Sequence, residues 1–251
     1  MSDITQTSPV YVLVHGAWHG AWCWSRTIPA LTAMGVSAHA INLTGVGERA
    51  HLLSAQINLS THAADVIETI RSHEWSSVVL VGHSYGGMVI TQAAQRLMNE
   101  LPGVLQRLVY IDAHVPMDGE SWGLVQSEET RQLRLAEGAR NGGVYLSQPD
   151  ASKFGLEGDD RDWVNRRQTP QPFGVYIDPV RVDNAALDRC HRTYINCTGN
   201  VLSGLEISRS RVKGNPLWRY MEMATGHDPM VSHPEALADC LVRSAEIAPQ
   251  G

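Results

Sequence analysis

The chain has 251 residues, of which 43% are hydrophobic and 18% charged, and its formal net charge at pH 7 is -6. This composition is typical of a folded globular protein, and the acidic balance argues against a nucleic-acid partner. The length suits one α/β domain with an insertion, or at most two small domains.

The N-terminus and the cysteines bear on location and on metal binding. Residues 1–8 are polar and are expected to form a flexible lead. No basic segment is followed by an apolar one, and no membrane span is visible, so we expect no signal peptide, no membrane association and a cytoplasmic protein. The four cysteines lack the spacing of a metal site and are interpreted as reduced thiols. No metal or cofactor is predicted.

Apolar runs alternate with helical periodicities in the first half of the chain. Continuous apolar runs predict strands that are buried on both faces of a parallel sheet. Apolar residues at positions 63, 66, 67 and 70 share one helix face, and Ser60 or Thr61 is expected to cap that helix. The predicted strands are Val10–Val14, Val36–Leu43, Val78–Val81 and Leu108–Ile111, and further helices are expected over Trp24–Met34 and around Ile90–Leu97.

The pattern breaks down between Val115 and about Asp188, where Gly, Pro, Gln, Asp and Arg are frequent. We interpret residues 115–188 as an inserted cap of short helices and a small hairpin. Its aromatic residues suit an apolar, or aromatic, group of a ligand. The alternative, that they form the cap's own small core, is favoured for most of them. These aromatic residues are Trp122, Trp163, Phe173 and Tyr176.

The alternation resumes after the insertion. Strands are predicted over Thr193–Cys197 and Leu217–Met223, and a last helix is expected to begin at the capping box Ser232-x-x-Glu235. Residues 1–114 and 189–251 are therefore expected to form one doubly wound, mainly parallel α/β sheet. The carboxyl ends of such strands share one edge. Five polar residues follow predicted strands and are expected at this edge: His15, Ser84, Asp112, Asn200 and His227.

The third strand ends at the sequence Gly82-His83-Ser84-Tyr85-Gly86, and a helical pattern follows at once. A Gly-x-Ser-x-Gly sequence is often an ordinary glycine turn. Between a strand and a helix, however, it predicts a sharp turn with strained backbone angles at the serine, where only small residues fit at the two flanking glycines. Ser84 is therefore the candidate nucleophile.

A serine hydroxyl needs a base, and His227 has the expected place late in the chain and close to the end of the last strand. His15 and His83 flank the predicted site and are expected to shape its loops through hydrogen bonds. Seven further histidines have no motif context and are interpreted as surface or structural residues: His19, His39, His51, His62, His73, His191 and His233.

With these motifs the chain resembles the α/β-hydrolase superfamily, and more narrowly the methylesterase and hydroxynitrile lyase family with its bacterial esterase relatives. The matching segments are His15–Trp22, Gly45–Arg49, Gly82–Gly87 and Thr225–Met230, which span nearly the whole chain in the family's order. The resemblance implies an oxyanion hole formed by the backbone N–H groups of Ala17 and Tyr85. It also implies a small-molecule ester as the partner, and it leaves a homodimer open.

Two departures from the lyases of this family favour hydrolysis. The lyases carry Thr or Asn directly after the first-strand histidine, where this chain has Gly16, and one lyase type carries Lys after the catalytic histidine, where this chain has Asp228. Gly16 is expected to face the substrate. The prediction is a carboxylic ester hydrolase; a cyanohydrin-cleaving lyase and a ligand receptor on a hydrolase scaffold are the alternatives.

The acid of the triad is the point at which the chain departs from its relatives. They carry Asp a few residues after the strand that corresponds to Thr193–Cys197, and this chain has Asn200 there. Asp112 ends the strand after the elbow helix, as the acid does in pancreatic-type lipases. We predict that Asp112 orients His227. The alternatives are that Asn200 does so, and that Asp112 caps a strand end or pairs with an arginine of the cap.

Overall fold

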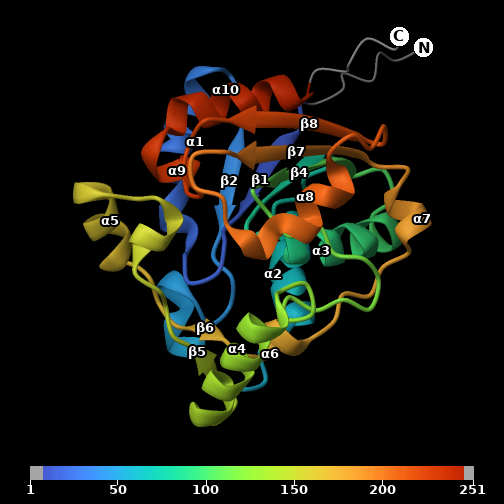
Figure 1. Cartoon of the computed structure of the whole chain (residues 1–251). Coiled ribbons are helices and arrows are strands. Elements are labelled where there is room, and N and C mark those ends of the chain that lie inside the picture. Colours follow the sequence, from blue (N-terminus) through green and yellow to red (C-terminus); the bar gives the residue numbers. More distant parts are fainter. Residues whose placement is uncertain (1–7, 246–251) are drawn as a thin grey trace, which may run out of the picture.

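The computed structural model describes residues 8–245, and the expected flexible lead, except for Ser8, lies outside the described residues. A six-stranded sheet forms the centre of the molecule, and every neighbouring pair of its strands is parallel (Figure 1). The predicted doubly wound α/β sheet is therefore confirmed. The strand order is β2-β1-β3-β4-β7-β8, with β1 Val10–Val14, β2 Ala38–Ile41, β3 Val78–His83, β4 Leu105–Ile111, β7 His191–Cys197 and β8 Trp218–Met223.

The register of the central strands brings their carboxyl ends together. Val14 at the end of β1 lies beside Gly82 of β3, and Ile111 of β4 lies between His83 of β3 and Ile195 of β7. All residues of β3 are buried, as expected for a central strand that is covered on both faces. The loops that follow β1, β3 and β4 therefore begin at one edge of the sheet.

Helices cover both faces of this sheet. Helices α1 and α10 pack against each other on one face, and α2 and α3 pack together on the other (Figure 1). Each presents an apolar stripe to the strands, as in Val66, Ile67 and Ile70 of α2. The core helices are α1 Thr27–Ala33, α2 Leu59–Ser72, α3 Gly86–Glu100, α8 Glu206–Val212, α9 Pro229–Ser232 and α10 Pro234–Ala245, with 3-10 turns η1 Ala21–Trp24, η2 Gly47–Leu52 and η4 Ser203–Leu205.

The segment between β4 and β7 adds no strand to the central sheet within the described residues. Its strands β5 and β6 pair antiparallel with each other, but η3 and α5 separate them in sequence, so they form a ribbon and not a tight hairpin. In Figure 1, α4, β5, β6 and α6 gather at the end of the molecule away from α10. The elements are α4 Glu128–Arg140, β5 Tyr145–Leu146, η3 Ala151–Phe154, α5 Gly158–Asn165, β6 Gln171–Pro172, α6 Gly174–Ile177 and α7 Asn184–Leu187.

Several predicted boundaries shift for local reasons. Asn58, and not Ser60 or Thr61, caps α2: its side chain accepts from the Thr61 N–H, and the Thr61 hydroxyl accepts from the Asn58 N–H. Strand β2 begins late because the Val36 N–H still bonds the Leu31 carbonyl at the end of α1. The last helix begins at Pro234, and Ser232 ends the short α9.

Within residues 8–245 we find no helix that combines the length and the apolar character needed to cross a membrane.

Candidate active site

Ser84 lies on the sharp turn between β3 and α3, with a backbone φ of 52°. A positive φ is rare for a residue other than glycine and persists where neighbours hold it. Here the Ser84 N–H donates to the Ile111 carbonyl at 3.2 Å, and the Ser84 carbonyl accepts from the N–H groups of Gly87 and His114, both at 3.1 Å. The residue is partly exposed, although its neighbours in the turn are buried. The turn therefore presents the hydroxyl at the sheet edge.

The two glycines of the motif are there because strand, helix and loop pack without room for side chains. A Cβ atom on Gly82 would lie 2.6 Å from the carbonyl oxygen of Gly86, and one on Gly86 would lie 2.7 Å from that of Val14. Both contacts are shorter than van der Waals distance and involve backbone atoms, which cannot move aside cheaply. The prediction that only the smallest residues fit at these positions agrees with this geometry.

His227 and Asp112 form a close buried pair. Nδ1 of His227 donates to Oδ2 of Asp112 at 2.6 Å, and the exposed fraction is 2% for His227 and 0% for Asp112. Burial alone would raise the pKa of Asp112, but the hydrogen bond from His227 and the charge of Arg209 outweigh it, and the pKa lies below its usual value. Asp112 is therefore ionised at neutral pH and fixes the ring of His227.

Asn200 is placed elsewhere. Its side-chain amide donates to the carbonyl of Lys153 at 2.8 Å, and its Cβ lies against Gly155. The structure thus brings Asp112, and not Asn200, to the imidazole of His227. Asn200 instead connects the loop after β7 to the inserted segment.

Arg209 of α8 is a residue that the sequence analysis missed. Its Nη2 donates to Oδ1 of Asp112 at 3.0 Å, its Nε to Asn196 at 2.9 Å and its Nη1 to the Leu202 carbonyl at 2.8 Å. One carboxylate therefore serves both His227 and an arginine. The sequence analysis had treated these two partners of Asp112 as alternatives, and Arg209 belongs to the core and not to the inserted segment.

Ala17 and Tyr85, the two predicted oxyanion-hole residues, are both buried and follow β1 and Ser84 respectively. The Tyr85 hydroxyl donates to Nδ1 of His62 at 3.0 Å, and Nε2 of His62 donates to the Thr44 carbonyl at 2.8 Å. The Ala17 carbonyl accepts from Nδ1 of His19 at 2.8 Å. His62 and His19 thus hold this part of the site. They have a structural role, as predicted, but neither is a surface residue.

Gly16 borders the nucleophile. A Cβ atom built on Gly16 would lie 2.7 Å from Nδ1 of His83 and 3.0 Å from Cβ of Ser84. A larger residue here would press on the elbow unless His83 moved. Nδ1 of His15 donates to the Gly16 carbonyl of its own loop at 2.8 Å, and Nε2 accepts from the N–H of Leu43, in the loop after β2, at 3.3 Å.

Asp228 is fully buried behind His227. Its Oδ2 pairs with Nε2 of His19 at 3.0 Å, and its Oδ1 lies 3.5 Å from Nε2 of His83. Burial would raise the pKa of Asp228, yet the charge of His19 and its hydrogen bond hold that pKa at about 2. Conversely, Asp228 outweighs the effect of burial on His19 and raises its pKa. This buried ion pair occupies the position where one lyase type has lysine.

His83 contributes to the placement of His227. Its Nε2 donates to the carbonyl of His227 at 2.9 Å, and the two rings lie 4.6 Å apart. The side chains of His83, His227 and Asp228 bring ligand atoms within 4.8 Å of one another, a spacing that could hold a metal ion. One polar atom of each is engaged: Nδ1 of His227 with Asp112, Nε2 of His83 with the His227 carbonyl, and Oδ2 of Asp228 with His19. Nδ1 of His83 and Oδ1 of Asp228 have no hydrogen-bond partner among the described residues. Through its bonded nitrogen, His83 supports the main chain of His227.

His114 was not singled out from the sequence, although it lies two residues after Asp112. It is buried, and its backbone N–H donates to the Ser84 carbonyl. Its own carbonyl oxygen approaches Gly87 so closely that a Cβ atom on Gly87 would lie only 2.1 Å from it. Burial and the nearby His227 lower the pKa of His114 to about 3, so that it is neutral. His114 thus packs the loop after β4 onto the elbow.

Aromatic rings from the inserted segment meet rings of the site. Phe154 lies 5.7 Å from the ring of His227 and 6.4 Å from that of Trp18, and Trp122 lies 5.7 Å from Trp18 and 5.2 Å from Tyr85. Trp122 therefore does more than fill the core of the inserted segment. Of the other predicted aromatics, Tyr176 packs on Trp122, Phe173 on Tyr176, and Trp163 on Trp22 of the core.

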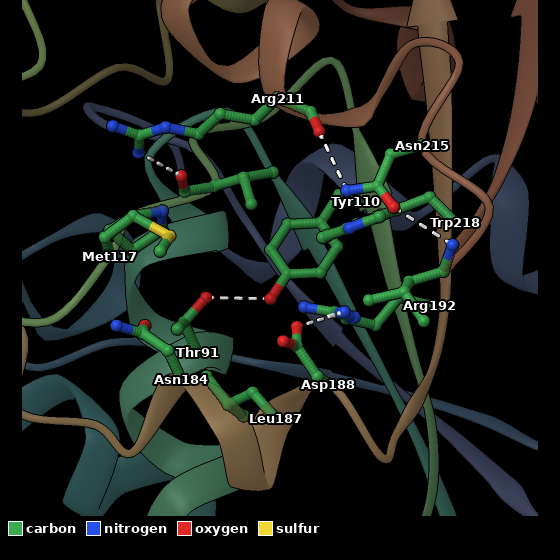
Figure 2. Close-up of a pocket in the computed structure, with 13 residues that line it drawn as sticks. Thr91, Tyr110, Met117, Asn184, Leu187, Asp188, Arg192, Arg211, Asn215 and Trp218 are labelled. Carbon is green, nitrogen blue, oxygen red and sulfur yellow. Dashed lines mark hydrogen bonds and ion pairs between the residues drawn. The ribbon is translucent and has the colours of Figure 1, made fainter.

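A separate cavity of about 250 Å³ is lined by residues of α3, β4, α7 and β8 and by Arg192 of β7 (Figure 2). Its polar groups largely pair with one another: the hydroxyls of Thr91 and Tyr110 are 2.8 Å apart, and Arg192 pairs with Asp188 at 2.6 Å and stacks on Trp218. None of the predicted site residues lines it.

A family model described as the alpha/beta hydrolase family matches residues 11–240. The chain belongs to this family. A carbendazim-hydrolysing esterase of a Nocardioides species (strain SG-4G) is 38% identical over 239 residues, 92% of this chain and 97% of that protein. Esterase PIR7B of Oryza sativa subsp. japonica is 26% identical over 94% of this chain and 95% of its own.

A solved structure of an extracellular alpha/beta-hydrolase from a Paenibacillus species superposes with a TM-score of 0.83 at 20% identity, over 95% of this chain and all of that one. At this identity the likeness shows the fold alone. The predicted fold and the resemblance to esterases of this family are confirmed, and the chain is an enzyme of the carboxylesterase type.

Proposed function

We propose that the protein hydrolyses small to medium esters through an acyl-enzyme on Ser84, with His227 as the base and Asp112 as the acid of the triad. One observation carries the proposal: the 2.6 Å hydrogen bond from Nδ1 of His227 to Oδ2 of Asp112, one strand away from the elbow that carries Ser84. This bond leaves Nε2 of His227 as the nitrogen that accepts the serine proton.

In the proposed reaction, Oγ of Ser84 attacks the ester carbonyl while His227 takes its proton. Asp112 stays ionised, because the hydrogen bond from His227 and the charge of Arg209 keep the pKa of Asp112 low, and it stabilises the imidazolium. The backbone N–H groups of Ala17 and Tyr85 stabilise the oxyanion, typically by ~3 kcal/mol each. His227 returns the proton to the leaving alcohol, and water then releases the acid by the same steps.

The aromatic rings around the site support an ester with a flat apolar group. Trp18, Trp122 and Phe154 lie next to the candidate triad and oxyanion hole, and flat rings pack well against such side chains. The Nocardioides relative is named as an esterase that hydrolyses carbendazim, which is the methyl ester of a carbamic acid whose nitrogen carries an aromatic ring. We therefore propose aromatic methyl esters and carbamate esters as the substrate class.

The alternative lyase reaction has less support. Gly16 supplies no side chain to bind a substrate hydroxyl, and a Cβ there would press against His83 and Ser84. Asp228 is taken up by its ion pair with His19. Neither position offers the group that the lyases use.

Labelling and kinetics together test the proposal. A fluorophosphonate should label Ser84 of the wild-type protein and should not label Ser84→Ala. That variant should lose about 10⁶-fold in kcat on a p-nitrophenyl ester. Carbendazim, an aromatic methyl ester and mandelonitrile are assayed in parallel. Label on another residue, near-normal activity of the alanine variant, or cyanohydrin cleavage without ester hydrolysis would each contradict the proposal.

A further inference from the structure

Trp18, the residue directly after Ala17, has a strained backbone. Its φ is 64°, a left-handed conformation that costs a non-glycine residue roughly 1–3 kcal/mol and persists only where the surroundings impose it. The φ of Trp18 orients the peptide between Ala17 and Trp18, which carries the Ala17 carbonyl and the Trp18 N–H, and so fixes the chain on the C-terminal side of Ala17. What holds Trp18 therefore holds one side of the candidate oxyanion hole.

The contacts that hold Trp18 come from the inserted segment. Its backbone N–H donates to Oε1 of Gln171 at 2.9 Å, its carbonyl accepts from the N–H of Thr169 at 3.0 Å, and its indole N–H donates to the carbonyl of Leu146 at 3.3 Å. Leu146 and Gln171 are direct partners in the β5–β6 ribbon. One residue pair of this ribbon thus binds Trp18 twice: Gln171 accepts from its backbone N–H and Leu146 from its indole N–H.

Further contacts support the bonds that Leu146, Thr169 and Gln171 make to Trp18. The guanidinium of Arg134 in α4 lies 5.2 Å from the ring of Trp18, and Arg134 is itself paired with Glu137 at 2.7 Å. The hydroxyl of Thr169 accepts from the N–H of Gly47 at 2.9 Å, which ties the same segment to the loop after β2. Gln171 is 0% exposed, so water does not compete for its bond to Trp18.

We propose that Gln171 is a positioning residue for the oxyanion hole: by accepting from the Trp18 N–H it keeps Trp18 left-handed and fixes the peptide that follows Ala17. Ala17 is thereby held in place, so that its N–H, in the preceding peptide, stays in reach of the developing oxyanion. This inference rests on the proposed function, because it needs an oxyanion to be formed on Ser84. On this inference the core supplies the N–H groups of Ala17 and Tyr85, and the inserted segment supplies Gln171, which holds Ala17 in place.

The test compares Gln171→Met with Gln168→Met. Methionine matches glutamine in length and removes the acceptor. Gln168 lies on the same segment and is 7% exposed, and neither of its amide atoms has a hydrogen-bond partner, so it is a matched control. Gln171→Met should lower kcat on an activated ester about 10- to 100-fold with KM within about threefold of wild type, because the lost interaction acts in the transition state. Gln168→Met should stay within threefold in both.

An aryl trifluoromethyl ketone, which forms a tetrahedral adduct on the serine, gives the second readout. Its inhibition constant should rise for Gln171→Met by the factor by which kcat/KM falls. Gln171→Asn, which keeps the amide but shortens it by one methylene, should show the same loss and serves if the methionine variant does not fold.

Three outcomes would overturn the inference: kcat of the Gln171 variants within threefold of wild type, equal losses in the Gln168 and Gln171 variants, or a rise in KM without a fall in kcat. Fluorophosphonate labelling of wild-type Ser84 separates these outcomes from a failure of the proposed function. If wild-type Ser84 is labelled and hydrolysis proceeds, the proposed function stands whatever the Gln171 variants do.

Discussion

Asp112 is held by its neighbours on every side. Its φ is 38°, its N–H donates to the Ile195 carbonyl at 2.8 Å, and its two carboxylate oxygens bind His227 and Arg209 separately. Like Ser84, it is a non-glycine residue with a positive φ directly after a central strand. Such strain at the ends of two neighbouring strands is typical of functional sites.

Replacing Asp112 by Asn tests its role. Asparagine keeps one oxygen to accept from Arg209 and places its NH2 group opposite Nδ1 of His227. Since that NH2 group donates, Nδ1 must accept, and the imidazole takes the wrong tautomer. We expect kcat for ester hydrolysis to fall about 10⁴-fold. Asn200→Ala removes only the bond to the Lys153 carbonyl and should stay within a few-fold of wild type. The assignment fails if Asp112→Asn remains active while Asn200→Ala collapses.

The sequence indicated Ser84 and His227 because a strand, a glycine motif and a helix are local features. It indicated Asp112 from the end of a strand, but left Asn200 open, because which loop reaches an imidazole depends on register. Arg209 could not be found this way. It is 97 residues from Asp112, and its helix α8 begins after an irregular segment with no motif.

The strands were predictable as elements because their apolar runs are continuous and are buried on both faces. β3 and β4 each differ from the prediction by two or three residues at one end, and β2 begins later than predicted because the Val36 N–H still bonds the Leu31 carbonyl of α1. Helix starts were less predictable. Ser60 follows Leu59 inside the first turn of α2, whereas Asn58 precedes the helix with an extended backbone, φ -135°.

A stability measurement on α2 distinguishes these two starts. Asn58→Ala removes the side-chain acceptor of the Thr61 N–H and should lower the free energy of unfolding by about 1 kcal/mol. Ser60→Ala changes an exposed residue within the first turn and should change it by less than half of that. Urea denaturation of both variants gives the comparison. Equal losses, or a larger loss in Ser60→Ala, would mean that the cap is misassigned.

Across the whole molecule, buried neutral histidines make the fold sensitive to acid. Burial lowers the pKa of His15, His83 and His114 to about 3 and that of His62 to about 4. The unfolded chain binds these protons below pH 6.5 and the folded chain does not. Acid therefore favours unfolding, with a slope for each such histidine that grows as the pH falls through 6.5 and approaches about 1 kcal/mol per pH unit below it.

Urea denaturation at pH 7, 6 and 5 checks this sign and slope. The free energy of unfolding should fall steadily over this range in the wild type. His114→Gln should reduce the fall between pH 6 and pH 5 by about 1 kcal/mol, and the fall between pH 7 and pH 6 by roughly half of that. The exposed His191→Gln should leave the slope unchanged. A stability that is flat between pH 7 and 5 would contradict the neutral state of these side chains.

The architecture of the whole molecule followed from the alternation of strands and helices, but the contacts between the core and the inserted segment did not. They are made by backbone carbonyls and by single side chains such as Gln171 and Phe154, which no periodicity marks. Gln168 and Gln171 lie three residues apart in one polar, proline-containing stretch, and nothing local indicates which of the two contacts the core.

The carbonyl of Phe154 accepts the N–H of His227 at 2.9 Å, and a Cβ on Gly226 would lie 2.8 Å from that same oxygen. The inserted segment, which an engineer would exchange to change substrate choice, thus also fixes the main chain of His227, the proposed base. Replacing the inserted segment with that of another protein would therefore also disturb the position of His227. Engineering of selectivity should keep the backbone around Phe154 and the side chain of Gln171, and should vary the ring at Trp122.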